Sequence, residues 1–108
     1  MALPPGVVAL KPGESCPPRS LCLYRDANYS GPAYAVGEGY AVDLNDLPCE
    51  GGAWGPTMAG NVSSWNNQTE MAAKLVDKDD KETTLAPGEK LTGGPTEDKI
   101  VKIAWASS

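Results

Sequence analysis

The side chains that most often carry catalysis are few in this chain of 108 residues, and histidine is absent. Without imidazole, no Ser-His-Asp triad, Cys-His pair or histidine zinc site can form. The three cysteines, Cys16, Cys22 and Cys49, lack the C-x-x-C spacing of a structural zinc site. The loop carboxylates Asp43 and Asp46 could in principle transfer protons, but nothing in the sequence marks them as buried. The sequence therefore predicts that the protein is not an enzyme.

The cysteines are better suited to a structural role. Cys16 and Cys22 are close enough in the chain to pair, and prolines bend the segment between them. A disulfide here would stabilise the fold by about 2 kcal/mol, while three reduced thiols remain the alternative because no export signal is visible. Cys49 is then unpaired, and we expect it to be buried and inert rather than linked to a partner.

Composition and charge exclude several classes of partner. The formal net charge of -5 and the pI of about 4.5 oppose binding to nucleic acid. No apolar run approaches the roughly 18 residues that span a bilayer, so no membrane association is expected. The first ten residues have no basic region and contain two prolines, which is unlike a signal peptide. The predicted location is extracellular or on a virion surface.

The elements that must position these residues are short strands, since the chain is rich in glycine (12) and proline (10). One stretch, residues 21–31, reads as a strand that folds over into a hairpin. Tyr24 and Tyr29 flank a polar turn there, and Gly31 supplies the backbone freedom that a tightly folded hairpin needs. Further strands are predicted at residues 33–36, 40–44, 61–65, 71–76, 82–85, 90–91 and 100–105.

The pattern Tyr24-x-x-x-x-Tyr29-x-Gly31 resembles the first-hairpin signature of the βγ-crystallin Greek key, and Ser63-Ser64 resembles the opening of its fourth strand. The segment from Cys16 to Cys22 is similar to the start of the bacterial I36 peptidase inhibitors. The resemblance implies an all-β fold, a single sandwich of two Greek-key motifs at about residues 20–66 and 70–106. This domain, residues 16–108, would follow an extended Pro/Gly-rich arm, residues 1–15.

Calcium sites in the βγ-crystallins follow the pattern (Asn/Asp)-(Asn/Asp)-x-x-(Ser/Thr)-Ser. The first motif has Ala59 and Gly60 at the two leading positions, which offer no side-chain oxygen. The second keeps the acids Glu97 and Asp98 but replaces the hydroxyls by Val101 and Lys102. A third acidic group, at residues 77–80, is interleaved with lysines and reads as a solvated turn. We therefore predict no metal site and no cofactor, with calcium as an open possibility.

Two segments are candidates for binding a protein partner. The arm carries Leu3, Val7, Val8 and Leu10, and its prolines allow at most an edge strand at residues 6–10. Aliphatics of this kind could be held by the chain's own domain or by a neighbouring protein, and we expect a neighbour because exposed aliphatics are unfavourable in water. Trp54 lies in a Gly/Pro-rich connection, residues 47–56, where it could either plug the core or bind a partner.

These features favour a non-enzymatic module that docks on a larger assembly, such as a phage capsid decoration or tail-associated protein. The first alternative is a secreted metalloprotease inhibitor of the I36 type, for which residues 47–56 form the only loop long enough. That loop has one cysteine, Cys49, and no cysteine follows it, so no disulfide can brace it. The second alternative is a calcium-stabilised βγ-crystallin module.

Overall fold

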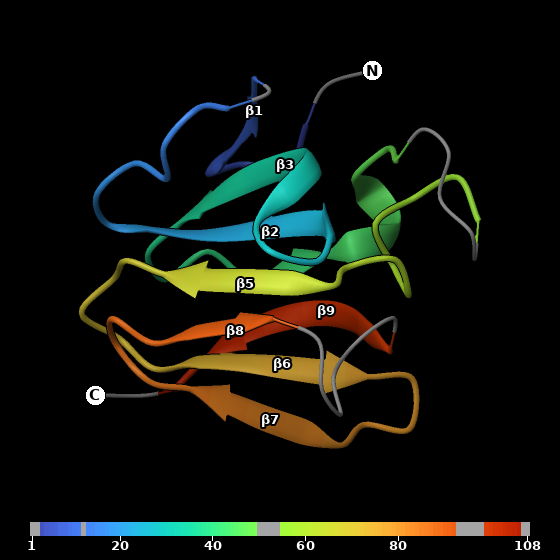
Figure 1. Ribbon diagram of the computed structural model, residues 1–108. Coiled ribbons are helices and arrows are strands. Elements are labelled where there is room, and N and C mark those ends of the chain that lie inside the picture. Colours follow the sequence, from blue (N-terminus) through green and yellow to red (C-terminus); the bar gives the residue numbers. More distant parts are fainter. Residues whose placement is uncertain (1–2, 12, 50–54, 93–98, 107–108) are drawn as a thin grey trace.

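A computed structural model describes residues 3–11, 13–49, 55–92 and 99–106 of the chain. These residues form two antiparallel sheets (Figure 1) and contain no α-helix, and so no helix among them could span a membrane. Sheet A has the strand order β1-β3-β2-β5-β8, and sheet B has the order β4-β9-β6-β7. The elements are β1 (Val7–Leu10), β2 (Ser20–Asp26), β3 (Ser30–Gly37), β4 (Val42–Asp43), the 3-10 turn η1 (Leu44–Asp46), β5 (Ser64–Asn67), β6 (Ala73–Asp77), β7 (Glu82–Leu85), β8 (Lys90–Thr92) and β9 (Ile100–Trp105).

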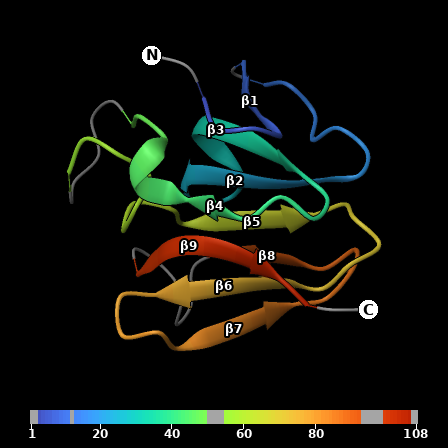
Figure 2. The ribbon, with the colours of Figure 1, turned by 180° about the vertical axis from the view of Figure 1, so that it is seen from behind.

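The two halves of the chain exchange one strand each, which confirms the predicted all-β sandwich. Strand β8 of the second half pairs with β5 in sheet A, and β4 of the first half pairs with β9 in sheet B. Figure 2, seen from behind, shows β4 and β9 on the near side, whereas in Figure 1 β9 lies on the far side. Because each half completes the sheet of the other, neither half has a full sheet of its own.

Several strands differ from their predicted bounds, and for two of them, β4 and β5, local hydrogen bonds explain the shorter strand. The strand expected at residues 40–44 is reduced to β4, because the Asp43 carboxylate accepts a hydrogen bond from the Asn45 N–H at 2.9 Å and caps the turn η1. The strand expected at residues 61–65 begins later, at Ser64, because the Asn61 N–H donates to the Met58 carbonyl at 3.0 Å and closes a turn first.

The core lies between the sheets and follows from alternation along the strands. In β2, Leu21 and Leu23 point inward, where they join Trp65 of β5, Leu75 of β6 and Ile103 of β9 in one buried cluster. Each such side chain contributes roughly 1.5–3 kcal/mol through burial. This cluster joins the two sheets into one domain.

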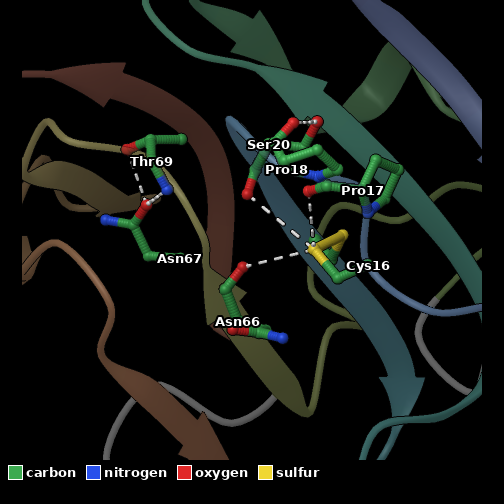
Figure 3. Close-up of a disulfide and its surroundings, with 8 residues drawn as sticks. Cys16, Pro17, Pro18, Ser20, Asn66, Asn67 and Thr69 are labelled. Carbon is green, nitrogen blue, oxygen red and sulfur yellow. Dashed lines mark hydrogen bonds between the residues drawn. A yellow bond between two sulfur atoms is a disulfide. The ribbon is translucent and has the colours of Figure 1, made fainter.

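The outer face of sheet A carries a second, smaller cluster, formed by Cys22, Tyr24, Ala33 and Ala35. Cys16 covers it and is joined to Cys22 by a disulfide, with 5.9 Å between the two Cα atoms. Figure 3 shows the Cys16 sulfur above β2, where it lies 3.8 Å from the Ser20 carbonyl and 3.9 Å from the Asn66 carbonyl. The disulfide therefore holds the segment that precedes β2 against the outer face of sheet A.

The hairpin between β2 and β3 folds over as predicted, and Ser64 fastens it. The rings of Tyr24 and Tyr29 meet edge to face, with centroids 5.7 Å apart. The Ser64 hydroxyl, fully buried, donates to the Asp26 carbonyl at 2.7 Å and accepts from the Tyr29 N–H at 3.0 Å. Gly31 has a φ of +80°, where a side chain would overlap the Asp26 carboxylate.

The N-terminal residues do not form a free arm. The predicted edge strand is present as β1, which pairs with β3 from Val7 to Leu10. Val7 is buried in the core, Leu3 packs against that core and Leu10 packs against the outer cluster, so only Val8 of the four aliphatics is exposed. The expectation that all four aliphatics are exposed was wrong, because three of them pack within the chain, and their contact with a partner stays a prediction. A turn closed by the Val7 N–H and the Pro4 carbonyl at 3.2 Å brings the chain back onto its own sheet.

Candidate functional site

The candidate site is the connection between η1 and β5, whose two ends run side by side. The Cys49 N–H donates to the Pro56 carbonyl and the Met58 N–H donates to the Leu47 carbonyl, both at 2.8 Å. Pro48 and Thr57 form an antiparallel bridge between them. We call these paired residues, 47–49 and 56–58, the stem. Trp54, the predicted contact residue in this connection, lies outside the described residues.

A buried amide holds one side of the stem. Asn61, 2% exposed, uses its Nδ2 to donate to the Thr57 carbonyl at 2.6 Å and to the Gly55 carbonyl at 3.2 Å. Burying an amide group is favourable only when its hydrogens find acceptors, so this geometry ties the position of residues 55–57 to Asn61. Asn61 is the part of the site that sequence reasoning missed, because nothing in the sequence shows which carbonyls its side chain reaches.

The other side of the stem is fixed by the core. The Tyr34 hydroxyl donates to the Pro48 carbonyl at 2.6 Å, and burial raises the pKa of that hydroxyl. Leu47 and Met58 are fully buried, whereas Pro48 and Pro56 are exposed. The stem therefore has one face packed into the core and one face that presents prolines to solvent.

Cys49, at the base of this connection, is a free and buried cysteine with 2% exposure. Burial raises the pKa of its thiol, although the charge of Arg25 acts in the opposite direction. The thiol is thus protonated near neutral pH and is a poor nucleophile. This placement agrees with a structural cysteine.

The acidic turn of the second half borders an open cleft lined by Ala59 and Gly60, by side chains of the β6–β7 hairpin, and by Lys99. The residues do not fit a calcium ion. The Asp77 carboxylate already accepts hydrogen bonds from the N–H groups of Asp79 and Lys81, at 2.8 and 3.0 Å. Among the described residues, no group of three or more acidic, cysteine or histidine side chains gathers around a point. Glu97 and Asp98 lie outside the described residues.

The other predicted residues fall into two sets. The fold-signature residues Tyr24, Tyr29, Gly31, Ser63 and Ser64 meet at the folded hairpin, where the Ser63 N–H donates to the Tyr24 carbonyl at 2.9 Å. The predicted contact residues of the arm lie along β1 and its approach. Val7 belongs to the same buried cluster as Leu47, Cys49 and Met58 of the stem, and Leu3 packs against that cluster.

Comparisons with known proteins agree on family and fold. The model of peptidase inhibitor family I36 matches residues 9–86, which is more than half of the chain and includes the stem. One solved structure, described as "Evolution of the eye lens beta-gamma-crystallin domain fold", matches with a TM-score of 0.70 and 19% identity, covering 94% of this chain and 98% of that one. At this identity the likeness supports the fold alone. No curated protein sequence matches the chain significantly.

Proposed function

Because the chain belongs to peptidase inhibitor family I36, we propose that it binds a peptidase and blocks it with the connection between residues 47 and 58. The observation that carries the proposal is the stem. An inhibitory segment must stay in one conformation in the active site, because ordering a flexible loop on binding weakens the complex. Five hydrogen bonds, from Cys49, Met58, Tyr34 and Asn61, restrict the two ends of this connection beforehand.

The stem takes over the role expected of a disulfide. The connection has one cysteine, and that cysteine is buried and free. Its ends are held instead by backbone pairing and by two side chains, Tyr34 of β3 and Asn61 of the turn that precedes β5. The prolines at positions 48 and 56 are exposed, and a bond that precedes proline has no amide hydrogen to offer a peptidase. Both features favour a segment that binds without being released as product.

The peptidase class proposed is a thermolysin-like metallopeptidase outside the cell, which is the class implied by the resemblance to the I36 inhibitors. A disulfide between Cys16 and Cys22 is consistent with an oxidising compartment. In this proposal the chain contributes no catalytic group of its own. Its partner is a protein, and binding depends on shape and backbone contacts.

The two other interpretations have less support. Docking on a phage particle depended on an exposed apolar arm, and the side chains of Leu3, Val7 and Leu10 are packed within the chain. Stabilisation by calcium would need carboxylate ligands, and the Oδ1 atom of Asp77 already accepts from the N–H groups of Asp79 and Lys81. Neither interpretation is favoured by a specific feature of the described residues.

The test is a titration of a thermolysin-like metallopeptidase with the purified chain, followed by hydrolysis of a fluorogenic peptide. A serine peptidase is titrated in parallel to define the class. We expect the metallopeptidase to lose activity as the chain approaches equimolar amounts. Full activity of both enzymes at a large excess of the chain would rule out the proposal.

A further inference from the structure

We infer that the cleft beside the stem is a second contact for the peptidase, and that it binds an acidic segment of that enzyme. The inference rests on the proposed function and names the chemistry of the surface that the partner presents there. A stable protein complex buries about 800 Å² of each partner, supplied by about 20–30 residues on each side. The connection between η1 and β5 is too short to supply this area alone, so neighbouring surface belongs to the interface.

The cleft directly adjoins the stem. Asn45 of η1 comes just before the stem and Ala59 follows Met58, and both Asn45 and Ala59 line the cleft. The Gly60 N–H donates to the Ile100 carbonyl at 2.9 Å, which joins this wall to the start of β9. The β6–β7 hairpin also lines the cleft, and its turn lies at the same end of the sandwich as the stem (Figures 1 and 2). A partner that reaches the stem is therefore also close to the cleft.

Three ammonium groups line this cleft. They belong to Lys78 and Lys81 of the hairpin turn and to Lys99 before β9, and all three side chains are exposed. Within the part of the chain that the structure describes, no carboxylate forms an ion pair with any of them. The chain has only nine lysine and arginine residues and a formal net charge of -5. A third of its basic side chains therefore meet at one cleft of an acidic protein.

The carboxylates that line the cleft are mostly engaged by other groups. The Asp77 Oδ1 accepts from the N–H groups of Asp79 and Lys81, at 2.8 and 3.0 Å. The Glu82 carboxylate lies 3.6 Å from the Lys74 ammonium group. Among the described residues, Asp79 is the one lining carboxylate without such a contact. Unpaired positive charge thus exceeds unpaired negative charge here, and a cleft concentrates that field on an anion that enters it.

The arrangement suits spaced carboxylates better than a single phosphate. A phosphate site directs several N–H groups or an arginine at one point. No arginine is among the described lining residues, and the N–H groups of Asp79 and Lys81 already donate to Asp77. Lysine carries a point charge on a flexible stem, which can meet carboxylates at several places. With a volume of about 800 Å³, the open cleft has room for an extended chain rich in Asp or Glu.

The first test needs no enzyme. The isotope-labelled chain is titrated with a hexaglutamate peptide and, separately, with hexaglutamine, while NMR records the backbone amide shifts. Hexaglutamate should shift the amides of Ala59, Gly60 and the β6–β7 turn, and hexaglutamine should leave them unchanged. Asp79→Asn should bind hexaglutamate more tightly, because this variant removes the unpaired carboxylate. Equal shifts with both peptides, or none with hexaglutamate, would overturn the assignment of the cleft.

The second test compares inhibition by two triple variants that lose the same charge. The cleft variant is Lys78→Gln, Lys81→Gln, Lys99→Gln. The control variant changes exposed side chains outside the cleft and is Lys11→Gln, Arg19→Gln, Lys90→Gln. Each exposed ion pair changes affinity by a factor of about 2–3, so the cleft variant should inhibit the metallopeptidase about 5- to 20-fold less well at low salt. High salt should remove most of this difference, because it screens exposed charges.

The control variant should inhibit within about 2-fold of the wild type, since its substitutions lie outside the proposed contact. Equal loss of inhibition by the two triple variants would mean that only net charge matters, which would overturn the cleft as a contact. Failure of the wild type to inhibit would overturn the peptidase as the partner. A chain that inhibits but does not bind hexaglutamate would retain the proposed function and lose this inference alone.

Discussion

Replacing Ser64 by alanine is predicted to lower the free energy of unfolding by about 2–3 kcal/mol. The Ser64 hydroxyl makes two hydrogen bonds, at 2.7 Å to the Asp26 carbonyl and at 3.0 Å from the Tyr29 N–H. Each bond contributes about 1 kcal/mol, and leaving the two backbone groups without their partner adds to the loss. The hydroxyl also helps to hold a strained backbone in place. Asn28 and Tyr29 have φ values of 59° and 58°, a left-handed conformation that costs free energy for residues other than glycine.

The assay is urea denaturation together with the melting temperature, which should fall by about 8–18 °C for a domain of this size. Ser30→Ala is the matched control, because its hydroxyl makes one exposed hydrogen bond, to the Ala27 carbonyl at 2.9 Å. That variant should lose less than about 1 kcal/mol. If Ser64→Ala lost no more stability than Ser30→Ala, the hydroxyl would not be what fastens the folded hairpin.

Two further predictions concern the cysteines. The double variant Cys16→Ala, Cys22→Ala should lower the free energy of unfolding by about 2 kcal/mol, since the disulfide closes a short loop. Unfolding curves of the wild type with and without reductant should show the same difference. Equal stability of the oxidised and reduced wild type would contradict this prediction. Cys49 should react slowly with a thiol reagent until the chain is denatured, because its thiol is buried. Burial also raises the pKa of this thiol in the folded state. The thiol's contribution to stability is therefore complete below the pKa of the unfolded thiol, about 8.5, and is lost as the pH rises through the folded pKa. Rapid labelling of the native chain, or a Cys49→Ser variant with an unchanged alkaline stability profile, would refute this.

The features that the sequence predicts well are local. The folded hairpin depends on Tyr24, Tyr29 and Gly31, which are close in the chain and have types that suit few other structures. The disulfide likewise joins residues with a sequence separation of 6. The second half lacks such aromatics, yet its strands are recognisable from the alternation of apolar residues in β6 and β9.

Features that depend on contacts between distant segments are harder to predict. The four residues of β1 are all apolar, so the sequence does not show that Val7 enters the core while Val8 faces solvent. The register of β1 on β3 determines which of these side chains faces the core. The hydrogen bonds from Asn61 that hold the candidate site were also not predicted. A search for a second cysteine could not reveal an asparagine that reaches carbonyls four and six residues before it.

The central claim is that residues 47–58 contact the peptidase, and hydrogen exchange of the complex with an inactivated metallopeptidase tests it most directly. The account predicts that the enzyme slows exchange within this connection and leaves β1 unchanged. Slowed exchange at β1, with none in the connection, would contradict it.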